Sequence, residues 1–193
     1  MKIAIISTSP RQGSNSLKVA KYMAKSLANT EHRIRVANFE EIDIPMVGRS
    51  SLKASALTQF QSNLIDIWKE AELVIFVIPE YNWITSGELI NALHQLGQKD
   101  FSYLFDNKVF ALAGVSRGRG GRRPCTEIGT VLGKLISFLN QHSVISPLIL
   151  ESHETHNQLA DDGTSLGNAF YEKSAQKFLD YSLTIANRWH RSE

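Results

Sequence analysis

Short, wholly apolar runs alternate along this chain with longer segments in which apolar residues recur every three or four positions. A continuous apolar run is typical of a strand buried on both faces, whereas the longer period is typical of a helix with one buried face. The pattern predicts five strands, at residues 3–6, 34–37, 73–78, 109–115 and 143–146. The third run is the most apolar and predicts the central strand, and the polar residues of the second predict an edge strand.

Five helices are expected, one after each strand, because each intervening segment carries an apolar stripe. The stripes comprise Leu17, Ala20, Met23, Ala24 and Leu27; Leu57, Phe60, Leu64, Ile67 and Trp68; Leu89, Ile90, Leu93 and Leu96; Ile128, Val131, Leu132, Leu135, Ile136 and Leu139; and Ala175, Phe178, Leu179, Ser182, Ala186 and Trp189. Pro147 is expected to end the last strand, and a solvated polar loop over 151–163 to follow it. Right-handed crossovers then require a parallel sheet with helices on both faces. Proteins with either of the two common doubly wound strand orders bind their ligands beyond the carboxyl ends of the strands.

Composition narrows the class of protein. The 193 residues suit a single domain over 1–193, and the net charge of +2 is too small to favour nucleic-acid binding. Cys125 is the only cysteine, so no internal disulfide can form, which fits a reducing compartment and predicts a cytoplasmic protein. No apolar run approaches the roughly 20 residues needed to cross a bilayer, so no membrane partner is expected.

The loop after the first strand has the composition of a phosphate site. It reads Thr8-Ser9-Pro10-Arg11-Gln12-Gly13-Ser14-Asn15-Ser16 and leads directly into a helix. Hydroxyls, one arginine and the free amides of a helix N-terminus suit a phosphate monoester. The glycine patterns of dinucleotide-binding and Walker loops are both missing. Alternatively, Ser14 or Asn15 only caps the helix and Arg11 is solvated.

The loops after the third and fourth strands offer different groups. Residues 79–87 place Tyr81 and Trp83 where two aromatic rings can border a flat ligand, although both are also compatible with ordinary half-buried positions or a subunit contact. Residues 116–123 combine glycines, which let backbone amides approach a ligand, with four arginines that can attract a nucleotide phosphate. No aromatic platform accompanies these arginines, so RNA is not expected. All three loops should meet at one rim of the sheet.

Taken together, these loops resemble those of the NADPH-dependent FMN reductase family, over roughly residues 1–147. Ser9, Arg11, Ser14, Asn15 and Ser16 match its first loop; Pro79, Glu80, Tyr81 and Asn82 match its Pro-Glu-Tyr-Asn motif; and Ser116, Gly118, Gly120 and Gly121 match its third loop. The chain departs from the family pattern in having Thr8 for glycine, Ser86 for proline, and His94-Gln95 for Asp-Trp.

The resemblance implies a flavodoxin-like fold of strand order 2-1-3-4-5, with FMN as cofactor and NADPH or NADH as electron donor. It further implies a small-molecule acceptor of flavin, quinone or azo type, and flavin chemistry that requires no catalytic side chain. A homodimer or homotetramer would wall the flavin site, and Trp68 is compatible with such a contact. The expected cofactor-binding residues are Ser9, Arg11, Ser14, Asn15, Ser16, Pro79, Glu80, Tyr81, Asn82, Trp83, Ser116, Arg117, Gly118 and Gly120.

Other readings stay open. An electron-carrier flavodoxin or an FMN-binding regulatory protein would bind the same cofactor without reductase turnover. His153 and His156, near acidic residues, are conceivable metal ligands, but they lack an evident supporting shell and no metal is expected. His94 lies near enough to the second loop to touch a substrate, although a structural role is commoner. Cys125 precedes the expected fourth helix, where a thiolate would be stabilised, without an evident histidine partner.

Overall fold

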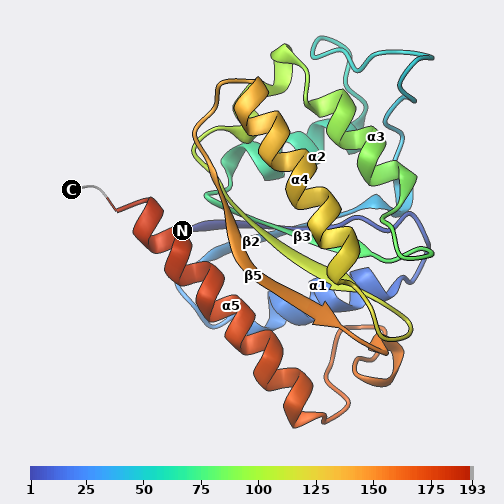
Figure 1. The fold of residues 1–193 in the computed structure, drawn as a ribbon, viewed down its shortest axis with the longest axis vertical. Coiled ribbons are helices and arrows are strands. Elements are labelled where there is room, and N and C mark those ends of the chain that lie inside the picture. Colours follow the sequence, from blue (N-terminus) through green and yellow to red (C-terminus); the bar gives the residue numbers. More distant parts are fainter. Residues whose placement is uncertain (192–193) are drawn as a thin grey trace.

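Five strands and five α-helices alternate along residues 1–191, which the computed structural model describes. The strands are β1 Lys2–Ser7, β2 Arg33–Asn38, β3 Leu73–Pro79, β4 Val109–Val115 and β5 Val144–Ser152. The α-helices are α1 Asn15–Ser26, α2 Gln59–Glu70, α3 Gly87–Leu96, α4 Arg122–Phe138 and α5 Ala169–Trp189 (Figure 1). Short 3-10 helices are η1 Phe39–Glu41, η2 Lys99–Phe105 and η3 Thr155–Asn157.

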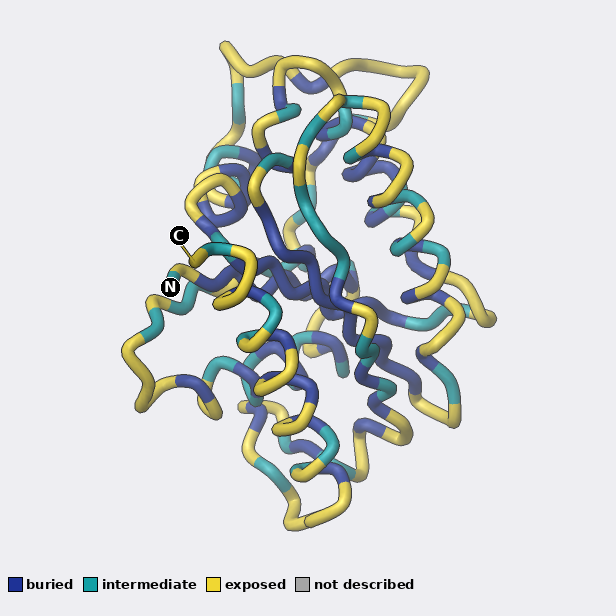
Figure 2. Tube along the Cα trace, turned by 60° about the vertical axis from the view of Figure 1, so that its left-hand side comes forward, coloured by how far each residue is buried: buried dark blue, intermediate teal, exposed yellow. Residues whose placement is uncertain are grey.

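The strands form one parallel sheet in the order β2-β1-β3-β4-β5, which confirms the expected flavodoxin-like topology. Helices α1 and α5 cover one face, and α2, α3 and α4 cover the other (Figure 1). Every residue of β3 and β4 is buried, as two-sided coverage requires. Figure 2 shows this buried sheet at the centre, with exposed positions on the outer sides of the helices.

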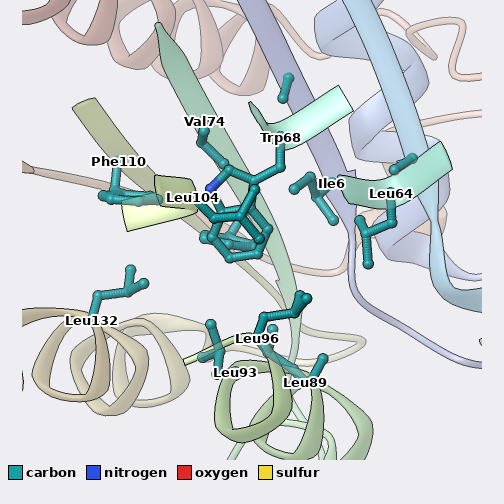
Figure 3. Packing of buried hydrophobic residues seen from close by; sticks show 14 of the residues in the cluster. Ile6, Leu64, Trp68, Val74, Leu89, Leu93, Leu96, Leu104, Phe110 and Leu132 are labelled. Carbon is teal, nitrogen blue, oxygen red and sulfur yellow. The ribbon is translucent and has the colours of Figure 1, made fainter. Parts of the chain in front are cut away.

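An aromatic cluster fills the larger core, between the sheet and helices α2 to α4. Trp68 on α2 is 2% exposed, and its ring meets Phe76, Phe105 and Phe110 in edge-on contacts with centroids 5.1–6.1 Å apart. Such pairs favour edge-to-face geometry because the ring edge is positive and its face negative. Figure 3 shows Trp68 in the middle of the cluster. The sequence left Trp68 compatible with a subunit contact, but its side chain lies in the core and is not available for one.

Helices α2 and α4 begin at residues other than those the sequence indicates. Leu57 lies before α2, because Thr58 forms a capping box with Gln61 and fixes the start of the helix at Gln59. Helix α4 begins at Arg122, well before its apolar stripe, so Arg122 and Arg123 belong to the helix rather than to the third loop. Cys125 likewise lies inside α4 rather than before it.

Strand β5 does not end at Pro147, contrary to the sequence prediction, but continues to Ser152. The pairing with β4 shifts around the proline, from Phe110 opposite Ile145 to Leu112 opposite Ile149. A residue without an N–H is tolerated at such an irregularity in an edge strand, because no ladder hydrogen bond is required of it there. The strand prediction failed because it treated proline as a terminator regardless of position in the sheet.

The expected polar loop over 151–163 is also more structured than predicted. Its first residues complete β5, η3 follows, and Leu159 pairs with Ser165 across a short antiparallel bridge. Thr155 and Leu159 are buried. This segment therefore packs on the domain rather than extending into solvent.

Among the helices of residues 1–191, none has the length and apolar character to cross a membrane.

Candidate functional site

A cleft of about 300 Å³ opens at the carboxyl ends of β1, β3 and β4, where the three loops meet. Nine of the predicted site residues line it: Ser9, Arg11, Ser14, Asn15, Ser16, Pro79, Glu80, Tyr81 and Arg117. The lining also contains Gln12, Gly13, Val115 and His156, which the sequence prediction did not include. Asn82, Trp83, Ser116, Gly118 and Gly120 lie in the same loops but outside this lining.

The first loop ends in a helix start that can receive an anion. The Ser14 hydroxyl accepts from the Leu17 amide at 3.1 Å, so Ser14 does cap α1 as the alternative reading supposed. The Ser16 side chain is 1% exposed, and its hydroxyl has no hydrogen-bond partner within residues 1–191. The amides of Asn15 and Ser16 lie in the first helical turn, where no intrahelical acceptor exists. A buried hydroxyl and free amides at a positive helix end fit a phosphate group.

Two departures from the family pattern contact each other. The Thr8 hydroxyl donates to the Val77 carbonyl of β3 at 3.1 Å, and Ser86 donates to the Thr8 carbonyl at 3.0 Å. Ser86 also caps α3 by accepting from the Leu89 amide. The residues that replace glycine and proline thus join the first loop to the start of α3. Glycine and proline, which the family pattern has at these positions, have no side-chain hydroxyl to form such bonds.

The second loop is a tight hairpin. Tyr81 and Ile84 exchange backbone hydrogen bonds of 2.8 and 3.1 Å around Asn82 and Trp83, whose φ angles are +49° and +74°. Two positive φ values are typical of a type I′ turn and are unusual for a bulky tryptophan. Trp83 is 69% exposed at the hairpin tip. The hairpin therefore presents Tyr81 toward the cleft and leaves Trp83 outside its lining.

Tyr81 links the second loop to the first. Its hydroxyl lies 2.8 Å from the Ser9 hydroxyl, and the Arg11 guanidinium stands over its ring, 4.3 Å from the centroid. This cation–π contact orients Arg11 along one wall of the cleft. Arg11 is exposed to solvent, and its guanidinium rests on the Tyr81 ring.

Glu80 shapes the third loop. Its carboxylate accepts from the Gly121 amide and from the Ser116 hydroxyl at 3.4 Å, and its own amide donates to the Val115 carbonyl. A Cβ added at Gly120 would overlap this carboxylate. Glu80 and Gly120 are therefore packed against each other, and their contacts serve to position the loop.

Ion pairing divides the four arginines of this region into two pairs. Arg122 pairs with Glu151 of β5, and Arg123 lies 3.8 Å from Glu127 one helical turn later. Arg117 and Arg119 are exposed, and Arg117 lines the cleft. The third loop therefore supplies positive charge to the cleft lining through Arg117.

On α3, Gln95 is buried and His94 is exposed. Gln95 is buried and accepts from the Leu52 amide while donating to the carbonyls of Pro45 and Ser50 at 2.8 Å. It thereby fixes the irregular segment before α2. His94 is exposed on the same helix and does not line the cleft.

Within residues 1–191, no three histidine, cysteine or acidic side chains form a group able to hold a metal ion.

Cys125 is expected to be chemically inert in the native protein. Burial raises the pKa of its thiol well above the ordinary range, and the nearby Glu151 carboxylate acts in the same direction. Because only the thiolate attacks disulfide reagents, 5,5′-dithiobis(2-nitrobenzoate) should titrate no thiol in native protein and one in urea. Rapid native reaction at neutral pH would contradict this prediction.

Several solved structures share the fold. FerB, a flavoenzyme NAD(P)H:(acceptor) oxidoreductase from Paracoccus denitrificans, is 18% identical with a TM-score of 0.75, covering 97% of each chain. The NADH:FMN oxidoreductase EMOB in its apo form is 18% identical with a TM-score of 0.62, covering 95% of this chain and 89% of its own. An FMN-dependent NADH-azoreductase from Bacillus anthracis str. Ames Ancestor, in complex with FMN, is 16% identical with a TM-score of 0.56, covering 97% and 100%. Among curated proteins, no sequence matches significantly.

The family assignment comes from the sequence itself. The family model of NADPH-dependent FMN reductase matches residues 1–145, a region that contains all three loops of the cleft and ends early in β5. The chain therefore belongs to the NADPH-dependent FMN reductase family, which confirms the enzyme class, the FMN cofactor and the nicotinamide donor expected from its sequence.

Proposed function

We propose that this protein binds FMN in the cleft by its phosphate and reduces a quinone, azo or flavin acceptor with electrons from NADPH or NADH. The observation that carries the proposal is the buried, unpartnered Ser16 hydroxyl beside the free amides of α1, with Arg11 on the adjacent wall. A buried hydroxyl without a partner is costly unless a ligand supplies one. A phosphate monoester has the acceptor oxygens that this arrangement requires.

The fourteen predicted residues are our proposed cofactor site, and nine of them line the cleft. Ser9 to Ser16 would bind the phosphate, while Tyr81, Asn82 and the third loop would border the flavin ring. When bound, FMN supplies a ring that accepts hydride from a nicotinamide and returns two electrons to an acceptor. The protein orients the reactants and provides charge. Arg117 and the loop amides would favour negative charge on the reduced ring.

The acceptor class is proposed by analogy with the similar structures. Their names describe an NAD(P)H:(acceptor) oxidoreductase, an NADH:FMN oxidoreductase and an azoreductase. Quinones, azo compounds and flavins are all small and largely flat, which suits an open cleft bordered by Tyr81. No side chain in the cleft is required to act as a general acid or base.

The direct test is to purify the protein, record its visible spectrum and identify any extracted pigment. We expect a flavin spectrum, or one restored by added FMN, that bleaches when NADPH is added anaerobically and returns with a quinone. A protein that refuses excess FMN would contradict the proposal. Bleaching so slow that no steady-state NADPH consumption follows would instead favour an electron carrier or a regulatory flavoprotein.

Arg117 and Arg119, which have no ion-pair partner within residues 1–191, are expected to select the donor. In an Arg117→Ala/Arg119→Ala variant, the preference for NADPH over NADH should fall by about tenfold, because the extra phosphate of NADPH loses charge-assisted contacts. The measurement is the ratio of kcat/KM for the two donors. Arg123→Ala, which removes an arginine already paired with Glu127, should leave the ratio unchanged. An unchanged ratio in the double variant would refute this role.

We also propose that the protein is a homodimer or homotetramer. Trp83 and Ile84 at the hairpin tip are 69% and 48% exposed, and Ile84 borders an apolar groove with Ile90 and Val131. Exposed apolar surface beside a ligand cleft is typical of subunit contacts. Light scattering after gel filtration should show more than one chain, and Ile84→Ser should lower the mass. A monomeric wild-type protein would exclude this assembly.

A further inference from the structure

The turn after β5 lies beyond the matched family region and contributes a side chain to the cleft. The family match ends at residue 145, whereas His156 stands in η3 and lines the cleft together with Arg11 and Arg117. We propose that His156 binds a phosphate group in the cleft by donating a hydrogen bond from its imidazole, an inference that rests on the proposed function. It would be a specificity residue that the family motifs do not contain.

The turn is firmly attached to the third loop. The Thr155 hydroxyl is fully buried, 2.7 Å from the Ser152 hydroxyl, and donates to the Ser152 carbonyl at 3.0 Å. The Glu154 amide donates to the Gly118 carbonyl at 2.9 Å. Since these contacts fix the backbone on the residue before His156, little backbone ordering is left to oppose ligand binding.

The same segment is attached to α1 on its other side. Lys18 pairs with Asp161 at 2.7 Å, and η3 itself packs against α1. The Gly163 backbone approaches so closely that an added Cβ would lie 2.7 Å from the Tyr22 amide. Lys18 is in the first turn of the helix, next to the phosphate loop. These contacts attach the segment that carries His156 to α1, the helix whose first turn contains Ser16.

The charges around the cleft favour an anion as the partner of His156. Arg11 and Arg117 are the two arginines in the lining, and both carry a permanent positive charge. Glu80 is the one carboxylate in the lining, and both of its oxygens are used by Gly121 and Ser116. A second carboxylate, that of Glu40, lies outside the lining and accepts from the Gly13 amide at 2.7 Å. Phosphate can come from two sources, the monoester of FMN or the phosphates of the nicotinamide donor. Both present the same acceptor oxygens to an imidazole N–H.

The experiment compares His156→Ala and His156→Gln with His153→Ala. His153 belongs to the same segment and is exposed, as His156 is, but it lies 3.6 Å from Glu151 and does not line the cleft. Dissociation constants for FMN and riboflavin are measured on apoprotein by flavin fluorescence, and for NADP⁺ by the change in flavin absorbance. Thermal melting checks that each variant is folded.

If His156 binds the FMN monoester, His156→Ala should weaken FMN binding by about tenfold and leave riboflavin binding unchanged. His156→Gln, which keeps an N–H donor, should partly restore the affinity for FMN. If it binds the donor, FMN binding should be unchanged and NADP⁺ should weaken by about tenfold. Either result supports the proposal, provided that His153→Ala behaves like wild type. Unchanged constants for both phosphate ligands, or an equal loss for FMN and riboflavin, would overturn it. Wild-type protein that binds no FMN would instead contradict the proposed function, so the two failures are distinguishable.

Discussion

Gly114→Ala is expected to cause a loss of stability near the upper end of what one core substitution produces, about 3 kcal/mol. A Cβ at Gly114 would overlap the Gly121 carbonyl and lie 2.7 Å from the Gly121 Cα. Both atoms belong to backbone, so no side-chain rotation can relieve the contact. Strand β4 lies between β3 and β5 and is buried along its length, which prevents it from moving away.

The rest of the strain would fall on Gly121 and the third loop. Gly121 has a φ of +103° at the start of α4, and its amide donates to Glu80. Displacing Gly121 would break that hydrogen bond. It would also shift the third loop, which places Arg117 in the cleft lining. We therefore expect FMN affinity to fall together with stability in Gly114→Ala.

Gly129→Ala is the matched control, because it adds the same methyl group to a glycine nearby in the fold. Gly129 lies within α4, and an added Cβ would meet only Leu112 Cδ1 at an ordinary 3.6 Å. Replacing a helical glycine by alanine should raise stability by up to about 1 kcal/mol. Urea unfolding of both apoproteins measures the two effects. Equal midpoints for Gly114→Ala and wild type would show that the strand and loop can separate.

How much of this structure could be predicted from sequence depended on whether local signals were sufficient. The strands at 73–78 and 109–115 were recognisable because burial on both faces requires a continuous apolar run. The position of the three loops at one rim then followed from parallel topology. By contrast, Pro147 is accommodated within β5 because the strand is at the edge of the sheet, and edge position is a tertiary property.

The same limit applies to the cleft. Nothing near Glu80 in the sequence indicates that its carboxylate positions Gly121, because the two residues are brought together only by adjacent strands. The sequence indicates His156 only as a conceivable metal ligand, because its position at the cleft depends on contacts of its segment with α1 and the third loop. A carboxyl-end position after a parallel strand was the one available signal, and the irregular length of β5 obscured it.

Ser16→Ala should separate ligand binding from stability more sharply than any other single change. Removing a buried hydroxyl that lacks a partner should leave the apoprotein as stable as wild type or more stable. The same change removes a hydrogen bond to a charged phosphate, worth about 1.5–3 kcal/mol, so FMN affinity should fall roughly tenfold to a hundredfold. Riboflavin, which has no phosphate, should bind unchanged.

Ser7→Ala provides the control for this prediction. The Ser7 hydroxyl, at the end of β1, is also buried without a hydrogen-bond partner in residues 1–191, but Ser7 is not in the cleft lining. Its removal should affect the apoprotein much as Ser16→Ala does and leave FMN affinity unaltered. Flavin fluorescence titration and thermal melting measure both quantities on each variant. If Ser16→Ala bound FMN as tightly as wild type, the unpartnered hydroxyl would not be a phosphate ligand, and the cofactor would have to be held by other groups of the cleft.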